Sequence, residues 1–398
     1  MSEQTAAEPQ LSLGVMARSL KENERRLALH PEHLSRIPEE LRSRVFLEEG
    51  YGSSFGLSDE QLADFVGGFR SREDLVAECD VILQPKPLLS DVQQLRDGQT
   101  LWGWPHCVQD AELTQVAIDK HLTLIAFEAM NHWKSDGSFN LHVFHKNNEL
   151  AGYCSVLQAL QIAGTTGHYG RRMRAAVIGF GATARGAVTA LNALGIHDVD
   201  VLTHRDVAAV ASPIHSVRMV QLDSDEQDDT EAEHTGPTHA VVDEERLPLA
   251  PFLAEHDIIV NCVLQDPDAP LMFLTEDDLP LLVPGSILID VSCDAGMGFS
   301  WASPTGFEDP SFIVGDNILY YAVDHSPSYL WNSATWENSE AILPFLPTVM
   351  GGGAAWDEEP TIQRAIEIRE GVIQNPAILS FQHRSATPPH VRSRAGAS

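Results

Sequence analysis

The sequence is poor in basic residues and in cysteine. Its 26 Lys and Arg residues face 57 Asp and Glu residues, which gives a formal net charge of −31. Such a chain lacks the positive charge that neutralises nucleic-acid phosphates or anionic lipids, so we expect neither a nucleic-acid nor a membrane partner. The five cysteines are dispersed without a C-x-x-C pair, which favours reduced thiols over a disulfide framework; no metal site is predicted.

Long apolar runs are also missing. No stretch of about 18 uninterrupted apolar residues is present, so no membrane span is expected. The N-terminal segment MSEQTAAEPQ has no basic stretch followed by an apolar one, so we expect no signal peptide and a cytoplasmic protein. With 398 residues, 43% of them hydrophobic, the chain can still bury two or three domain cores.

Strand-like and helix-like segments alternate along most of the chain, which predicts an α/β fold. The segment up to residue 147 is expected to form one α/β layer. Beyond it, strands predicted at 175–179, 198–203, 257–263 and 286–291 are typical of a doubly wound parallel sheet. The acidic stretch 222–245 is expected to be a surface loop, and the chain beyond about 327, including 361–375, is expected to be helical.

A glycine-rich turn follows the first strand of that sheet. Residues 179–184 read G-F-G-A-T-A and fit the G-x-G-x-x-A pattern of dinucleotide-binding turns. The first glycine permits a tight turn, the second lets the backbone approach a diphosphate, and the new helix offers free amide groups to the anion. The predicted cofactor-binding residues are Gly179, Gly181, Ala182, Thr183 and Ala184. The alternative is a glycine turn without a ligand.

The end of the next predicted strand bears on which cofactor is used. A carboxylate there holds the ribose hydroxyls of NAD and repels a 2′-phosphate. This chain instead has Thr203, followed by His204 and Arg205. Because a guanidinium offers a planar fork of donors to phosphate, we expect NADP(H) to be preferred, with NAD(H) possible. The alternative is that Arg205 points to solvent.

Four polar residues stand at expected strand ends or beside apolar segments: Arg26, Lys86, His106 and Asp294. A nicotinamide enzyme acting on an α-keto acid needs cations that bind the substrate carboxylate. It also needs a group that donates a proton to the carbonyl or to the imine nitrogen. These residue types meet that need. Taken singly, each has a plainer interpretation: a solvated charge, a core imidazole, or an Asx turn before Ala295-Gly296.

Six ordered motifs join these residues: ERRLALHP, LQPKP, GWPH, IAFE, VIGFGATARG and LIDVSCDAG. From about residue 11 to 340 the sequence resembles the alanine dehydrogenase and pyridine-nucleotide transhydrogenase superfamily. Within it, GWPH, LAGYCSVLQAL and VLTHR look most like the N5-(carboxyethyl)ornithine synthase branch of opine-type dehydrogenases.

The resemblance implies a role for each residue. The substrate-binding Arg of the family falls on Arg26, its carboxylate-binding Lys on Lys86, and its acid/base His on His106. The Asp near the nicotinamide falls on Asp294. Glu128, in IAFE, matches a recurrent family acid whose role stays open.

One departure from the family concerns substrate size. Alanine dehydrogenases have an Asn-Met-Pro turn where this chain reads His325-Ser326-Pro327. The change leaves room for an amine partner larger than ammonia, so we count His325 among the predicted substrate-binding residues.

The resemblance also implies two Rossmann-like lobes. Residues 1–147 and the helices of 328–398 are expected to form the substrate domain, and residues 148–327 the NAD(P)-binding domain. The expected activity is an NADPH-dependent condensation of a pyruvate-like keto acid with the amine of a basic amino acid. Alanine dehydrogenase, a saccharopine-type dehydrogenase and a nucleotide-binding module without catalysis remain alternatives. The partners are then small molecules, and a homo-oligomer is the default expectation.

Overall fold

The computed structural model describes residues 10–204, 217–224, 236–265 and 270–393. The chain divides into two compact units, Met1–His145 with Trp331–Ser398, and Lys146–Leu330. The domain boundaries predicted from the sequence lie after residues 147 and 327. No helix in the described ranges is both long and apolar enough to cross a membrane.

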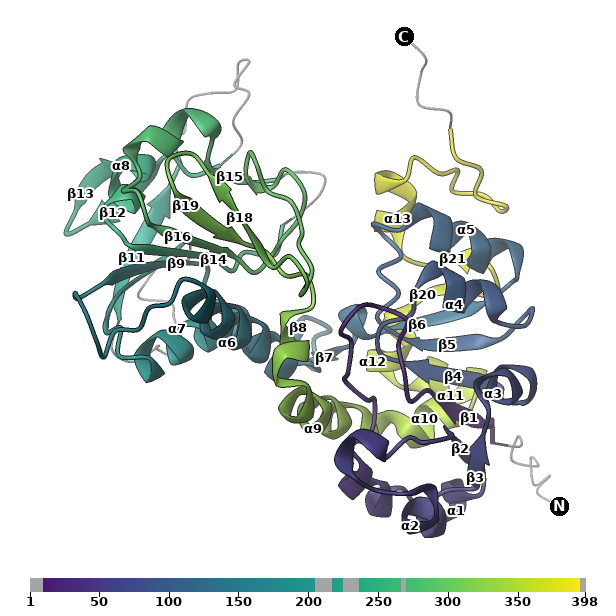
Figure 1. Ribbon diagram of the computed structural model, residues 1–398. Coiled ribbons are helices and arrows are strands. Elements are labelled where there is room, and N and C mark those ends of the chain that lie inside the picture. Colours follow the sequence, from purple (N-terminus) through teal and green to yellow (C-terminus); the bar gives the residue numbers. More distant parts are fainter. Residues whose placement is uncertain (1–9, 205–216, 225–235, 266–269, 394–398) are drawn as a thin grey trace, which may run out of the picture. The chain divides into compact units, whose positions relative to one another are not determined.

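The first unit contains an eight-stranded sheet in the order β21-β20-β6-β5-β4-β1-β2-β3 (Figure 1). All pairs from β6 to β3 are parallel, and β20 and β21 are antiparallel. Its strands are β1 (Leu13–Val15), β2 (Val45–Glu48), β3 (Gly68–Arg70), β4 (Val81–Gln84), β5 (Thr100–Gly103), β6 (Thr123–Ala126), β20 (Ile366–Arg369) and β21 (Val372–Ile373). A separate hairpin pairs β7 (Asn131–Trp133) with β8 (Phe139–His142).

Helices cover both faces of this sheet. Their bounds are α1 (Glu39–Arg42), α2 (Asp59–Leu62), α3 (Arg72–Glu78), α4 (Leu89–Gln94), α5 (Ala111–Asp119), α9 (Trp331–Ile342), α10 (Leu346–Met350), α11 (Gly353–Glu358), α12 (Pro360–Ala365) and α13 (Pro376–Phe381). Alternate strand residues enter opposite cores, so Leu83 packs with α9–α12 whereas Ile82 packs with α3–α5 and α13. Burial on both faces explains why these strands read as continuous apolar runs.

The second unit contains a nine-stranded sheet in the order β13-β12-β11-β10-β9-β14-β16-β19-β18. Its strands are β9 (Arg174–Ile178), β10 (Asp198–Thr203), β11 (Arg218–Asp223), β12 (His239–Val242), β13 (Glu245–Pro248), β14 (Ile258–Asn261), β16 (Ile287–Asp290), β18 (Ser311–Val314) and β19 (Ile318–Tyr321). β15 (Met272–Leu274) pairs separately with β17 (Gly298–Phe299). The sheet is doubly wound, because the chain runs outward from β9 through β10 and then continues on the other side at β14.

Helices also lie on both faces of the second sheet (Figure 1). α6 (His145–Ile162) and α7 (Ala182–Ala193) pack against Ala175 and Val177, and α8 (Leu249–Ala254) packs against Ala176 and Ile178. These two parallel-rich α/β units confirm the predicted fold class.

The prediction of a surface loop over 222–245 is wrong at both ends of this segment, where the chain forms strands. β11 extends to Asp223, and β12 and β13 add an antiparallel ribbon to the sheet. The two residues between them, Asp243 and Glu244, both have positive φ, as a tight two-residue hairpin turn requires. Ala240 is fully buried, so packing determines the structure of this acidic segment. Residues 225–235 lie outside the described ranges.

The predicted helix over 361–375 is also wrong beyond residue 365. β20 pairs antiparallel with β6, opposite Leu124 and Ile125, and turns tightly into β21. Alternation of Ile366, Glu367 and Ile368 fits a strand, and Glu370-Gly371 adopts the positive φ values of a hairpin turn. Burial against a sheet edge outweighs the helical spacing here.

Candidate active site

Four loops of the first unit follow neighbouring parallel strands. The strands β6, β5, β4 and β1 lie side by side in the sheet. Their carboxyl ends therefore meet along one edge, where open α/β sheets carry ligand-binding loops. Those loops hold, from β1 to β6, the residues Arg26, Lys86, His106 and Glu128.

The indole of Trp104 brings the two cations together. Its ring centroid lies 5.3 Å from Cζ of Arg26 and 5.9 Å from Nζ of Lys86. A ring face attracts cations at such separations. Lys86 Nζ also lies 2.7 Å from Nε2 of His106. Arg26 and Lys86 thus lie around one tryptophan, and His106 joins them through its contact with Lys86.

The short Lys86–His106 contact pairs the ammonium group of Lys86 with a ring nitrogen of His106. An ammonium group only donates, so Nε2 of His106 accepts and the ring proton lies on Nδ1. Nδ1 is 3.8 Å from Oε1 of Glu128. The His106 side chain is 46% exposed, so the ring is accessible to reactants.

Glu128 also holds the backbone of His106. His106 has a φ of 49°, in the left-handed region that side chains other than glycine rarely adopt. Its N–H donates to Oε1 of Glu128 at 2.7 Å, and its carbonyl oxygen accepts from the N–H of Asp110 at 3.0 Å. Such conformations persist only where the surroundings hold them, and they cluster at functional sites.

Glu128 is one of two interacting carboxyl groups. Burial and then the charge of Glu367 raise the pKa of Glu128 to about 8. Burial raises the pKa of Glu367 to about 7, although Asn375 Nδ2 donates to both of its oxygens at 2.9 and 3.1 Å. Within the described ranges, Oε2 of Glu128 is buried and has no hydrogen-bond partner. Glu128 is therefore mainly protonated at neutral pH.

Arg26 is nearly fully buried, with 5% of its surface exposed. Its Nε donates to Oε1 of Glu24 at 2.9 Å, and its Nη2 donates to Oε2 at 2.5 Å. The formal charges of this pair cancel. With Glu128 protonated, Lys86 supplies the net positive charge of the cluster.

The glycine turn of the second unit joins β9 to α7. Gly179 has a φ of 113°, and a Cβ there would lie 3.1 Å from the carbonyl oxygen of Cys262. A Cβ on Gly181 would meet nothing within 4 Å, and no side chain caps the first turn of α7. Open backbone beside uncapped amides fits a nucleotide diphosphate. Ala182 and Thr183 provide the first helical amides.

Small residues let α6 and α7 cross with their backbones in contact. A Cβ on Gly152 would lie 1.9 Å from the carbonyl oxygen of Thr183, and one on Gly186 would lie 1.7 Å from that of Glu149. Ala184 is fully buried in the core beneath α7. This packing fixes the start of α7 beside the glycine turn.

β10 ends beside the glycine turn without a carboxylate. Thr203, its last residue, is 5% exposed, and His204 after it is exposed. Arg205, predicted to meet a 2′-phosphate, lies outside the described residues.

Asp294 lies in the turn after β16, on the same sheet edge as the glycine turn. Burial raises its pKa. Asp290, fully buried, holds this turn by accepting the N–H of Cys293 at 3.1 Å, and it also accepts from Tyr320 Oη at 2.7 Å and Asn261 Nδ2 at 3.0 Å. Burial raises the pKa of Asp290 to about 6.

His325 lies between β19 and the short helix Ser326–Leu330. It is 3% exposed, its Nδ1 is 2.5 Å from Oδ1 of Asp324, and its ring meets the edge of Phe307 at 4.9 Å between centroids. In this arrangement its ring is held by protein partners.

The predicted residues therefore fall into two groups. Arg26, Lys86 and His106 gather in the first unit, and the glycine turn, Asp294 and His325 belong to the second. Sequence reasoning missed Glu24 and Trp104, although each stands two positions from a selected residue. Aromatic and acidic neighbours of a cation at a strand end are the signal that points to them. No group of three His, Cys, Asp or Glu side chains in the described ranges is arranged to hold a metal.

A doubly wound sheet with an open glycine turn, together with a second α/β unit carrying two cations and an imidazole, is typical of nicotinamide-dependent oxidoreductases. Family models match most of the chain. The alanine dehydrogenase/PNT N-terminal domain covers residues 14–151, and its C-terminal domain covers 158–376. The chain therefore belongs to the alanine dehydrogenase/PNT family, as its motifs indicated, and is an NAD(P)-dependent oxidoreductase.

Individual relatives are distant. The chain is 24% identical to alanine dehydrogenase from Mycobacterium tuberculosis, over 90% of this chain and 94% of that protein. It is 25% identical to N(5)-(carboxyethyl)ornithine synthase from Clostridium botulinum, over 80% and 89%. Among solved structures, an L-alanine dehydrogenase matches with a TM-score of 0.71 at 18% identity, over 93% and 99% of the two chains. A transhydrogenase from Sinorhizobium meliloti matches with a TM-score of 0.65 at 18% identity, over 92% and 99%.

Proposed function

We propose that this oxidoreductase uses NADPH to join an α-keto acid such as pyruvate to the side-chain amine of a basic amino acid. The observation that carries the proposal is the cluster of Arg26, Lys86 and His106 around Trp104. Similarity to N(5)-(carboxyethyl)ornithine synthase supports the opine-type reaction. The balanced reaction consumes keto acid, amine, NADPH and a proton, and it releases the secondary amine, NADP⁺ and water.

The keto-acid carboxylate binds Lys86 and Arg26. A charged pair of donors recognises a planar carboxylate with directional hydrogen bonds, and hydrogen bonds to charged groups are stronger than neutral ones. Glu24 keeps the Arg26 guanidinium oriented and neutralised. Lys86 therefore supplies most of the electrostatic attraction for the anionic substrate.

His106 moves the protons of the condensation. The amine attacks the keto carbon, and the carbinolamine then loses its hydroxyl as water to give an imine. Once Lys86 has turned to the substrate carboxylate, Nε2 of His106 takes a proton from the attacking amine and returns one to the leaving hydroxyl, because imidazole transfers protons in both directions near neutral pH. Glu128 orients the ring through the backbone N–H bond.

The glycine turn of the second unit would hold the dinucleotide, and the amides that begin α7 would bind its diphosphate. When bound, NADPH would supply the hydride equivalent for the imine. Asp294 orients the nicotinamide ribose or polarises the amine. His325-Ser326-Pro327 replaces the family's usual turn, and Asp324, which pairs with His325, favours a larger, positively charged amine.

The preference for NADPH rests on the end of β10. Thr203 and His204 stand where a carboxylate would repel the 2′-phosphate, and Arg205 follows them in the sequence. We expect a lower KM for NADPH than for NADH, and Thr203→Asp is expected to reverse the order. Thr189→Asp, on the exposed side of α7, is the matched control. A wild type that clearly prefers NADH contradicts this assignment.

The proposed reaction is tested by NADPH consumption across a grid of keto acids and amines, with product masses measured. A condensation product with ornithine or lysine supports it. Alanine dehydrogenase is the second candidate, because most of the curated relatives carry that name. It is favoured if ammonia and pyruvate give alanine and added basic amino acids change nothing. A 2-oxoglutarate adduct indicates a saccharopine-type reaction, and NADPH binding without turnover indicates a module without catalysis.

A further inference from the structure

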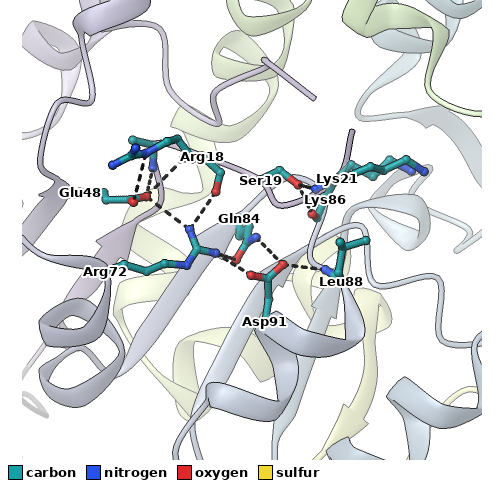
Figure 2. Close-up of polar contacts among 10 residues, drawn as sticks. Arg18, Ser19, Lys21, Glu48, Arg72, Gln84, Lys86, Leu88 and Asp91 are labelled. Carbon is teal, nitrogen blue, oxygen red and sulfur yellow. Dashed lines mark hydrogen bonds and ion pairs between the residues drawn. The ribbon is translucent and has the colours of Figure 1, made fainter. Parts of the chain in front are cut away.

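A largely buried arginine lies beneath two of the loops that carry the candidate site. Arg72 begins α3, and its side chain is 16% exposed. Nη1 lies 3.5 Å from Oε2 of Glu48, and Nη2 lies 2.7 Å from Oδ1 of Asp91. Figure 2 shows the guanidinium between these two carboxylates, which are 4% and 5% exposed.

Glu48 holds the loop that follows β1. Its Oε2 accepts the backbone N–H of Ala17 at 2.7 Å and that of Arg18 at 3.3 Å. Arg72 Nη1 donates to the carbonyl oxygen of Arg18 at 2.9 Å. These bonds fix the start of the loop that continues to Arg26.

Asp91 holds the loop that follows β4. Its Oδ2 accepts the N–H of Leu88 at 2.8 Å and Nε2 of Gln84 at 3.0 Å. Arg72 Nη2 also donates to Oε1 of Gln84 at 3.3 Å. Lys86 stands between Gln84 and Leu88, so the chain is fixed on both sides of it.

The two loops are also bonded to each other (Figure 2). Ser19 Oγ donates to the carbonyl oxygen of Lys86 at 2.8 Å and accepts the N–H of Lys21 at 3.1 Å. The loop bearing Arg26 and the loop bearing Lys86 therefore share one hydrogen-bonded network, with Arg72 at its centre.

We propose that Arg72 is a positioning residue that holds these loops in register, so that Arg26 and Lys86 bind one keto-acid carboxylate together. This inference rests on the proposed function. Only a guanidinium presents enough donors in one plane to meet two carboxylates, a carbonyl and an amide oxygen at once. Without it, the buried Asp91 loses its counter-charge and Glu48 keeps only Arg18, whose Nε lies 3.7 Å from Oε1. The Ser19–Lys86 bond is then the remaining link between the two loops.

The test compares Arg72→Gln and Arg72→Lys with Arg70→Gln. Arg70 lies two positions earlier, pairs with Glu78 and lies 3.7 Å from the centroid of the Phe46 ring. Its variant therefore loses an ion pair and a ring contact but no contact with either loop. Two measurements are made on the full chain: amide hydrogen exchange of peptides containing Ala17 and Leu88, and steady-state kinetics with pyruvate and ornithine. The exchange measurement needs no substrate, so it separates this inference from the proposed reaction.

In Arg72→Gln we expect exchange at both loops to rise at least about tenfold. We also expect the pyruvate KM to rise about 10- to 100-fold, while the NADPH dissociation constant stays within about twofold. Compared with Arg72→Gln, Arg72→Lys is expected to restore most of the thermal stability but less of the low pyruvate KM of the wild type. Arg70→Gln leaves both loops and the KM unchanged.

Faster exchange in only one loop, or in neither, overturns the proposal. So does loosening of both loops without a change in the pyruvate KM, which assigns Arg72 to stability alone. If Arg72→Gln does not fold, Ser19→Ala removes the direct bond between the loops and leaves the buried charges in place. It is expected to raise the pyruvate KM about 2- to 5-fold, and an unchanged KM contradicts the inference.

Discussion

Replacement of Glu128 by Gln tests the electrostatics of the candidate site most directly. The amide keeps an oxygen that accepts the His106 N–H but cannot ionise. In the wild type, with a pKa of about 8, roughly nine-tenths of Glu128 is charged at pH 9. The new charge lies at most about 9 Å from Lys86 Nζ, because the 2.7 Å and 3.8 Å contacts are separated by one imidazole ring.

At that separation a negative charge opposes a bound carboxylate by about 0.5 to 2 kcal/mol, for an effective dielectric constant between 80 and 20. The wild-type KM for the keto acid should therefore rise about 2- to 20-fold from pH 7 to 9, whereas Glu128→Gln should show a nearly flat profile. The assay is the initial rate of NADPH oxidation at saturating amine. A profile in Glu128→Gln that rises like that of the wild type refutes the reasoning.

Glu367 offers an internal control for this experiment. Its charge helps to raise the pKa of Glu128, so Glu367→Gln should lower that pKa and move the rise in keto-acid KM to lower pH. An unchanged midpoint in Glu367→Gln shows that the two carboxyl groups do not interact.

Three further substitutions are predicted. His106→Ala should lower kcat about 10²- to 10⁴-fold with unchanged NADPH affinity, measured by kinetics and fluorescence titration; retained turnover removes His106 from the mechanism. Burial raises the pKa of Glu367 to about 7 in the folded state, so the free energy of unfolding of the wild type falls as pH rises from about 4.5 to 7. Glu367→Gln cannot ionise, so its free energy of unfolding, measured by thermal unfolding, should gain about 1 to 3 kcal/mol relative to wild type between pH 4.5 and 8. Gly152→Ala should cost about 1 to 3 kcal/mol and weaken NADPH binding, because its methyl would lie 1.9 Å from the Thr183 carbonyl; unchanged binding and stability contradict the packing argument.

Local patterns predicted the order of strand, glycine turn and helix over residues 174–193. The order of apolar strand, G-F-G-A-T-A and helix specifies a backbone geometry that short-range sterics enforce, and β9, the turn and α7 follow it. The regular alternation of strands and helices likewise predicted two α/β units. Apolar runs such as residues 81–83 of β4 indicate a sheet covered on both faces, and such runs are visible in the sequence alone.

Segments whose structure depends on distant partners were predicted wrongly. Residues 366–369 carry helical spacing but pair with β6, far away in sequence. That error hid Glu367, which lies on β20 and influences Glu128 from there. The alternation of Ile366, Glu367 and Ile368 is compatible with a strand, but no local pattern shows that this strand joins β6.

The sequence allowed the residues of the candidate site to be selected, but it did not show that their side chains lie close together. Arg26, Lys86 and His106 follow three strands that become neighbours only in the folded sheet. Their convergence depends on the strand order. The same holds for Arg72, whose two carboxylate partners come from opposite sides of it in the sequence. Nothing in the sequence around Arg72 indicates that its side chain contacts two buried carboxylates.

The discontinuous first unit has a consequence for biosynthesis. Its sheet is completed only when β20, near the end of the polypeptide, joins β6. During translation the continuous stretch 146–330 can fold as soon as it has been synthesised. The preceding 145 residues cannot complete their sheet until β20 is synthesised, so the edge of β6 stays unpaired. Nascent chains stalled before residue 366 should therefore contain a protease-resistant unit of residues 146–330 and a protease-sensitive N-terminal part.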